Sequence, residues 1–108
     1  MTHRYLILDG EIGGTGLRDQ FEGFIQIDDV PISSLLKLEI ILWLENYHKN
    51  FYNKIKIEIE VIPELDFKGI EIMNKIQNEL GHEYKIRYYS DIKCKELKAL
   101  ENGQILVI

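Results

Sequence analysis

Apolar residues recur at helical spacing between residues 34 and 52, and this is the strongest structural pattern in the chain. One stripe consists of Leu36, Ile40, Trp43, Tyr47 and Phe51, and a second stripe beside it consists of Leu35, Leu38, Ile41 and Leu42. Ser33 is suited to the N-cap, because its hydroxyl can accept a hydrogen bond from a free backbone N–H of the first turn. The pattern predicts a long helix from Ser33 or Ser34 to Tyr52. Its apolar arc is wider than one covered face requires, so either two layers cover the helix or part of it meets a partner.

Shorter segments have the composition of strands. They are a buried run at 5–8, a short strand or extended loop at 21–27, an alternating segment at 54–61, a strand at 84–89 and a terminal strand at 104–108. The alternation at 54–61 is typical of a half-exposed edge strand, although a linking segment that happens to alternate is the competing interpretation.

Two further helices are expected. Pro63 suits the first turn of one of them and Gly81 its C′ position, while Gly69 on its apolar stripe permits a close backbone approach. Ser90 and Asp91 can cap a last short helix that ends near Leu100. The sequence thus predicts an α/β sandwich formed by a single domain over residues 1–108, with a mixed or largely parallel sheet of four to five strands and about three helices.

Four of the eight glycines fall between residues 10 and 16, directly after the first strand. A phosphate-binding loop requires a lysine after its last glycine, and none is present here. Asp19 occupies the place of the third glycine of a dinucleotide-binding motif, and no helix opens directly after the loop. We therefore interpret it as a tight ordered loop, or alternatively as a loop that presents its carboxylates to a partner, and we expect no nucleotide cofactor.

The net charge of −5 is concentrated at the N-terminal end, where residues 1–32 contain six carboxylates against two arginines. Such an acidic region repels nucleic acid and attracts basic partners. The first residues lack the apolar core of a signal peptide, no apolar run approaches the ~20 residues of a membrane span, and Cys94 is the only cysteine. We expect a cytoplasmic protein without membrane or nucleic-acid partners.

Catalytic signatures are weak. If the strands at 5–8 and 84–89 are parallel, Asp9, Glu11, Ser90 and Asp91 approach one edge of the sheet, where ligands of open α/β sheets bind. Asp9 and Asp91 have no histidine at ligand spacing, and Ser33 and Ser34 have no histidine partner in a recognisable motif. We therefore expect no enzyme, no metal and no cofactor.

The segments Tyr5-Leu6-Ile7-Leu8-Asp9-Gly10-Glu11, Gly13-Gly14-Thr15-Gly16-Leu17-Arg18-Asp19, Leu65-Asp66, Lys68-Gly69-Ile70 and Tyr88-Tyr89-Ser90-Asp91 together resemble a known group. They are similar to small acidic bacterial immunity proteins of contact-dependent growth inhibition and related polymorphic toxin systems. The resemblance implies tight binding to a cognate toxin, often a basic nuclease, without catalysis by this chain. The resemblance does not identify any binding residue in this sequence.

From charge and residue type, the expected partner-binding residues are Asp9, Glu11, Asp19, Glu22, Asp28, Asp29, Tyr89 and Asp91. Two alternatives stay open. One is a small regulatory module that forms a homodimer through the apolar arc of residues 35–52. The other is a metal-dependent enzyme that uses Asp9, Glu11 and Asp91.

Overall fold

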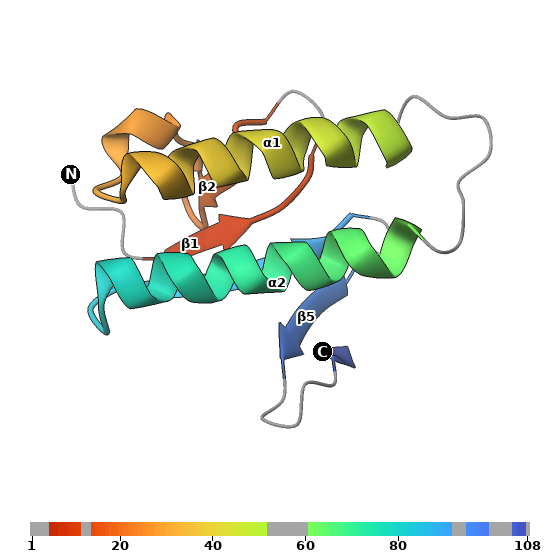
Figure 1. Ribbon diagram of the computed structural model, residues 1–108. Helices are drawn as coiled ribbons and strands as arrows, with labels where there is room; N and C mark the ends of the chain where they lie inside the picture. The colour runs from red at the N-terminus through yellow and green to blue at the C-terminus, as the bar shows by residue number, and fades with distance from the viewer. Residues whose placement is uncertain (1–4, 12–13, 52–60, 92–94, 100–104, 108) are drawn as a thin grey trace.

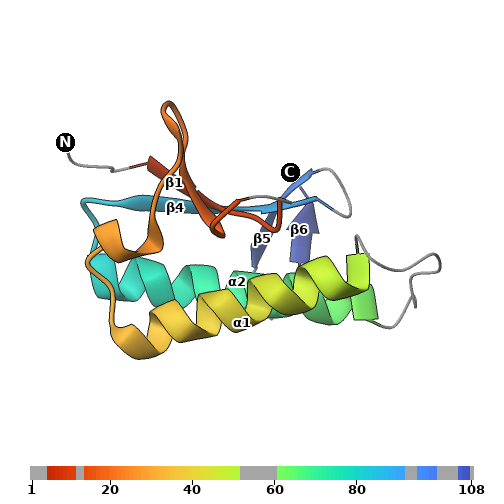
Figure 2. The ribbon, with the colours of Figure 1, turned by 90° about the horizontal axis from the view of Figure 1, so that it is seen from above.

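The computed structural model describes residues 5–11, 14–51, 61–91, 95–99 and 105–107. In chain order its elements are β1 (Tyr5–Leu8), β2 (Leu17–Asp19), β3 (Gly23–Phe24), the 3₁₀ helix η1 (Ile27–Asp29), α1 (Ser34–Phe51), α2 (Val61–Leu80), β4 (Lys85–Ser90), β5 (Lys95–Ala99) and β6 (Ile105–Val107). The expected α/β sandwich with a mixed sheet is confirmed, and its two helices, α1 and α2, lie side by side on one face of the sheet (Figures 1 and 2).

The described strands form one six-stranded mixed sheet in the order β3-β2-β1-β4-β5-β6. β1 and β4 are parallel, which fulfils the condition under which Asp9, Glu11, Ser90 and Asp91 approach one edge, and every other neighbouring pair is antiparallel. The strand count exceeds the expected four to five because β2 and β5 lie in segments for which the sequence predicts no strand. The described α-helices number two rather than about three.

The predicted short helix from Ser90 to about Leu100 is wrong, since Lys95–Ala99 form strand β5. Lysine, glutamate, leucine and alanine in this segment favour a helix locally. Pairing with β4 overrides that preference, because it satisfies backbone groups of β4 and brings Leu97, which is 1% exposed, into the core.

Two other expectations change in detail. The glycine-rich segment connects β1 to the antiparallel strand β2, which the sequence pattern did not predict. The expected strand or loop at 21–27 contains only the two-residue β3 before η1 begins. Most of the alternating segment at 54–61 lies outside the described residues, and Val61 is the first residue of α2.

α1 matches its prediction closely. The backbone N–H of Leu36 donates to the Ser33 hydroxyl at 3.2 Å, which confirms Ser33 as the N-cap. Its first stripe enters the core, with Leu36, Ile40, Trp43 and Tyr47 all buried.

α2 packs against both α1 and β4. The indole N–H of Trp43 donates to the Leu65 carbonyl at 2.9 Å. A Cβ at Gly69 would overlap the ring of Tyr88, so the close approach expected at this glycine is present. Gly81 has a positive φ of 84°, which places it as the C′ residue that ends α2.

Candidate interaction surface

The glycine-rich hairpin between β1 and β2 is packed onto α1. A Cβ at Gly10 would overlap the ring of Tyr47, and one at Gly16 would lie 2.8 Å from Cγ2 of Ile40. His48 Nε2 lies 3.0 Å from the Gly10 carbonyl oxygen, and because that partner only accepts, the nitrogen donates. The glycines therefore allow the hairpin to approach the helix.

Three backbone N–H groups among the described residues of this hairpin have acceptors within it. Asp9 N–H donates to the Gly16 carbonyl at 3.0 Å, and Gly14 N–H donates to the Glu11 carbonyl at 3.1 Å. Glu11 N–H donates to Oδ1 of Asp9 at 3.3 Å. A phosphate-binding loop presents such groups to its ligand. Their internal use supports the interpretation of this segment as an ordered turn.

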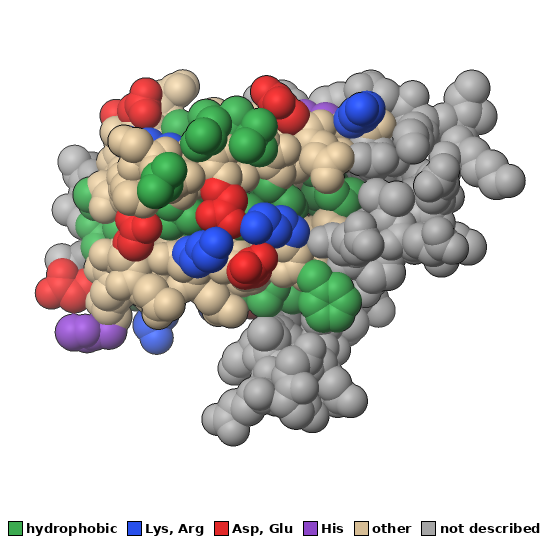
Figure 3. All heavy atoms as spheres, viewed as in Figure 1, with side chains coloured by type: hydrophobic (Ala, Val, Ile, Leu, Met, Phe, Trp, Pro, Cys, Tyr) green, Lys and Arg blue, Asp and Glu red, His purple; other side chains and the backbone are tan. Residues whose placement is uncertain are grey.

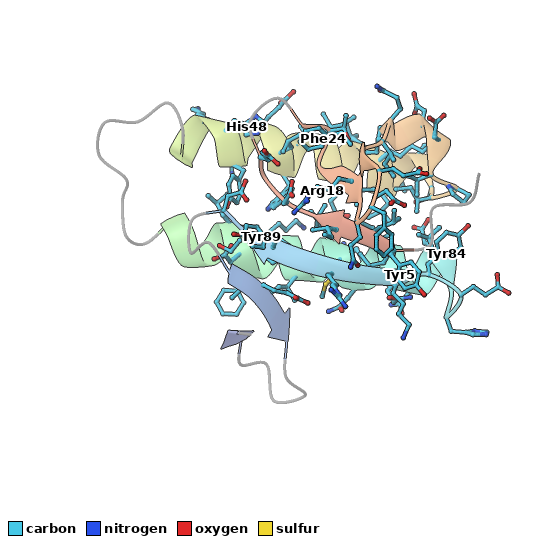
Figure 4. All side chains as sticks on the ribbon, turned by 180° about the vertical axis from the view of Figure 1, so that it is seen from behind. Tyr5, Arg18, Phe24, His48, Tyr84 and Tyr89 are labelled. Atoms are coloured by element: carbon cyan, nitrogen blue, oxygen red, sulfur yellow. The ribbon has the colours of Figure 1, made fainter. Side chains whose placement is uncertain are left out.

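Asp9 lies inside the protein. Its side chain is 2% exposed, and its Oδ2 accepts a charge-assisted hydrogen bond from Nε of Arg18 at 2.6 Å. Arg18 is 31% exposed and covers the carboxylate on the face of the sheet opposite the helices (Figure 4). The Asp9 charge is thus compensated within the fold.

Asp19 is also turned inward and is 6% exposed. Its Oδ1 accepts from the backbone N–H groups of Phe21 and Glu22, at 2.8 and 3.0 Å. An aspartate that binds the chain two and three residues ahead stabilises a turn. Asp19 therefore shapes the connection between β2 and β3.

The remaining acidic candidates face outward to different degrees. Glu11, Glu22, Asp28 and Asp29 are exposed, whereas Tyr89 and Asp91 are half-buried. β1 and β4 are parallel, and Leu8 pairs with Tyr88. Asp9 and Glu11 therefore follow the carboxyl end of β1, beside the carboxyl end of β4 where Tyr89 and Asp91 lie.

Asp19 and Glu22 lie near the opposite end of β1, because Asp19 pairs with Leu6. Asp28 and Asp29 belong to η1, beside the N-terminal end of α1 (Figure 1). The eight expected residues therefore lie at three places in the fold rather than in one acidic patch.

The expected metal-dependent alternative has no support in the described part of the chain. Within those ranges, no three His, Cys, Asp or Glu side chains are arranged to hold a metal ion. Asp9, which that alternative requires, is already paired with Arg18.

The second apolar stripe of α1 is left uncovered by the described residues. Leu35 is 81% exposed, Leu38 52%, Ile41 41% and Leu42 55%. Apolar side chains gather on this side of α1 in Figure 3. We call these four residues the α1 apolar face. Of the two explanations offered by the sequence for the wide apolar arc, contact with a partner is the one that this exposure favours.

Charged residues border the α1 apolar face on two sides. On one side Lys37 lies 3.5 Å from Asp28, whose side chain is 87% exposed, and this contact links η1 to α1. On the other side Glu39 lies 2.7 Å from Lys68 and 2.8 Å from Lys75 of α2. Hydrogen bonds from Lys68 and then Lys75 lower the pKa of the Glu39 carboxyl.

A buried polar cluster joins α2 to β4. Asp66 is fully buried and accepts hydrogen bonds from the Tyr88 hydroxyl at 2.8 Å and the Ser90 hydroxyl at 3.1 Å. Burial, and then the neighbouring Asp66, raise the pKa of Tyr88. The cluster lies in the core between helix and sheet, so its role is to hold those layers together.

Sequence reasoning did not assign the ion-pair network at Glu39 or the hydrogen bonds of Asp66. It named Asp66 only in one segment of the resemblance, and it gave Glu39 no role. The spacing of Lys68, Glu71 and Lys75 along one helix face is a signal that can indicate such a network.

Comparison with known proteins adds no family. No protein-family model matches the sequence, and no curated protein matches it. Neither α1 nor α2 combines the length and apolar content of a membrane-spanning helix.

Proposed function

We propose that the chain is a non-catalytic protein-binding module, and more specifically a cytoplasmic immunity protein that neutralises a basic toxin domain. The observation that supports it best is the α1 apolar face, with side chains that are 41–81% exposed. Large exposed apolar patches with a polar border are typical of protein interfaces.

The part of the border formed by η1 favours a basic partner. Asp28 and Asp29 lie beside the N-terminal half of α1, and Asp28 remains highly exposed despite its contact with Lys37. Negative charge around an apolar centre accelerates association with a positively charged protein and disfavours partners of the same sign. A nuclease active site that binds phosphates is such a positive surface.

A binding measurement with the protein encoded beside this gene, purified as a catalytically inactive variant, tests the proposal. The reversal Asp28→Lys with Asp29→Lys is expected to weaken binding at low salt and to reduce its dependence on salt. Leu38→Ser with Leu42→Ser is expected to accelerate dissociation. Glu83→Lys is a matched control, because Glu83 is exposed at the turn between α2 and β4.

Unchanged affinity in both double variants would contradict the proposed surface. Absence of binding to a catalytically inactive neighbouring toxin, together with no protection of cells that express the active toxin, would contradict the proposed function itself.

The same apolar face also supports the second candidate function, a homodimerising module. Sedimentation equilibrium distinguishes the two. A wild-type monomer over the concentrations used for binding contradicts self-association, whereas a dimer that Leu38→Ser and Leu42→Ser dissociate supports it.

A further inference from the structure

Half of strand β4 has an open edge. Its ladder with β5 consists of the pairs Tyr88 with Leu97, Tyr89 with Glu96 and Ser90 with Lys95, and no described residue of β5 pairs with the segment 85–87. Leu97 pairs with β4 on one side and with β6 on the other, and the next residues, Lys98 and Ala99, pair with β6 alone. The first half of β4 therefore has β1 on one side and no described strand on the other.

A groove of about 830 Å³ follows this open edge between β4, β5 and α2. Met73, Ile86 and Leu97 supply apolar side chains to it, and Asn74 and Gln77 of α2 supply amides. Asn74, Gln77 and Asn78 recur at helical spacing, so the amides line one wall. The groove thus combines an apolar surface with groups able to hydrogen-bond to a peptide backbone.

The Gln77 side chain occupies the position of a neighbouring strand. Its amide N–H donates to the Tyr84 carbonyl at 2.6 Å, and its carbonyl oxygen accepts from the Ile86 N–H at 3.2 Å. A residue on a parallel strand opposite Lys85 would use its own backbone N–H and C=O in the same two bonds. Gln77 therefore reproduces one step of a parallel ladder.

The rim of the groove has an excess of positive charge. Among the described residues that line the groove, the exposed Lys85 and Arg87 outnumber the one carboxylate, Glu96, which lies 3.7 Å from Arg87. In a protein with a net charge of −5, this is a local reversal of sign. It complements an acidic ligand.

We propose that this edge groove binds an extended peptide with acidic side chains, which adds to β4 as a parallel strand and displaces the Gln77 amide. Strand addition of this kind takes affinity from backbone hydrogen bonds and specificity from alternate side chains. The site lies outside the α1 apolar face and is independent of the proposed toxin binding.

The geometry determines which peptide groups face β4. Paired residues of neighbouring strands direct their side chains to the same face of a sheet. The peptide residue opposite Lys85 therefore has its acidic side chain beside Lys85, and its own backbone N–H donates to Tyr84. The residues on either side of it direct apolar side chains toward Met73 and Ile86.

The probe is a capped seven-residue peptide that alternates valine and aspartate, titrated into the ¹⁵N-labelled full chain. We expect the largest chemical-shift changes at the Ile86 N–H and the Gln77 side-chain amide. N-methylation of the aspartates removes the N–H groups that face β4 and is expected to abolish binding. N-methylation of the valines is the matched control and is expected to preserve it, because those N–H groups face away.

Protein variants test separately the positive charge of the rim and the displacement of the Gln77 amide by the peptide. Lys85→Glu with Arg87→Glu is expected to weaken peptide binding by about tenfold, as expected for two exposed charge contacts, while Lys49→Glu on α1 leaves it unchanged. Gln77→Ala removes the competing amide and is expected to strengthen binding by about three- to tenfold. Asn74→Ala removes a groove amide that does not bridge the strand edge and is expected to bring no such gain.

The proposal is overturned by equal binding of the two N-methylated peptides, by an alternating valine–lysine peptide that binds as well, or by shift changes confined to α1. Tighter binding of an oligothymidine than of the acidic peptide would also overturn it, because the rim would then select phosphate rather than a strand. If Gln77→Ala fails to fold, the N-methylated pair on the wild-type chain still decides the outcome.

Discussion

Leu35 and Leu36 provide a sharp test of which side of α1 is covered. They are adjacent residues of the same type in one helix, but Leu35 is 81% exposed and Leu36 is 3% exposed. Truncation to alanine removes the same atoms and changes helix propensity equally at both positions. Leu36→Ala is expected to lower the free energy of unfolding by about 2–5 kcal/mol, because it leaves a cavity in the core. Leu35→Ala is expected to change it by no more than about 0.5 kcal/mol.

Urea denaturation followed by circular dichroism measures both values, provided that the two variants share the wild-type m-value. A loss for Leu35→Ala as large as that for Leu36→Ala would refute the assignment of the α1 apolar face. Repeating the measurement over a range of protein concentrations separates two causes of such a loss. Stability that rises with concentration indicates a second copy on the face, whereas constant stability indicates cover from within the chain.

Three further predictions concern the contacts between layers. Gly69→Ala is expected to destabilise the protein by about 1–3 kcal/mol in urea titration, since its Cβ would overlap the Tyr88 ring; a loss below about 0.5 kcal/mol would contradict that packing. Tyr88→Phe deprives Asp66 of a buried hydrogen bond and is expected to cost about 1–3 kcal/mol at neutral pH. Because the pKa of Tyr88 is raised in the folded state, its stabilisation is complete below the ordinary tyrosine value of about 10 and is lost as pH rises above it. The difference between wild type and Tyr88→Phe should therefore shrink in alkaline urea titrations, and a constant difference would contradict this. Glu39→Gln is expected to cost less than about 1 kcal/mol at neutral pH, because its contacts with Lys68 and Lys75 are partly exposed. The pKa of Glu39 is lowered in the folded state, so this contribution is present above about pH 5 and disappears as pH falls below the ordinary glutamate value of about 4.3. Thermal unfolding of both proteins across this range measures the effect, and a difference that persists in acid would contradict it.

Local signals were sufficient for the long elements of the fold. The Ser33 cap and the stripe that includes Trp43 and Tyr47 define α1 to within a residue, because helix periodicity and capping are local properties. The alternation of strands and helices allows a parallel pairing of β1 with β4 but does not fix it, and the sequence predicts only a mixed or largely parallel sheet. The prediction for residues 95–99 was wrong for the opposite reason. This segment is a strand because it pairs with the edge of β4, and no local pattern reveals that pairing.

The orientation of individual carboxylates could not be predicted in the same way. Asp9 and Glu11 are two residues apart, yet Asp9 is paired with Arg18 inside the hairpin and Glu11 is exposed. Similarly, Asp19 is turned inward to bind its own turn, while Asp28 remains exposed. Charge counts along the chain therefore predict an acidic region but not which of its charges face a partner.

The wide apolar arc of α1 needs both the sequence and the structure for its interpretation. The sequence shows that there are two apolar stripes, and the structure shows which of them is buried. Periodicity alone shows two apolar stripes, and either of them is suited to pack on a sheet. The sheet and α2 bury the stripe of Leu36 and Ile40, and that choice leaves Leu35 and Leu38 exposed. A monomer gains no folding stability from exposed leucines and loses solubility through them. Their position beside Asp28 and Asp29 is the reason that we assign this face, rather than the glycine-rich hairpin, to partner binding.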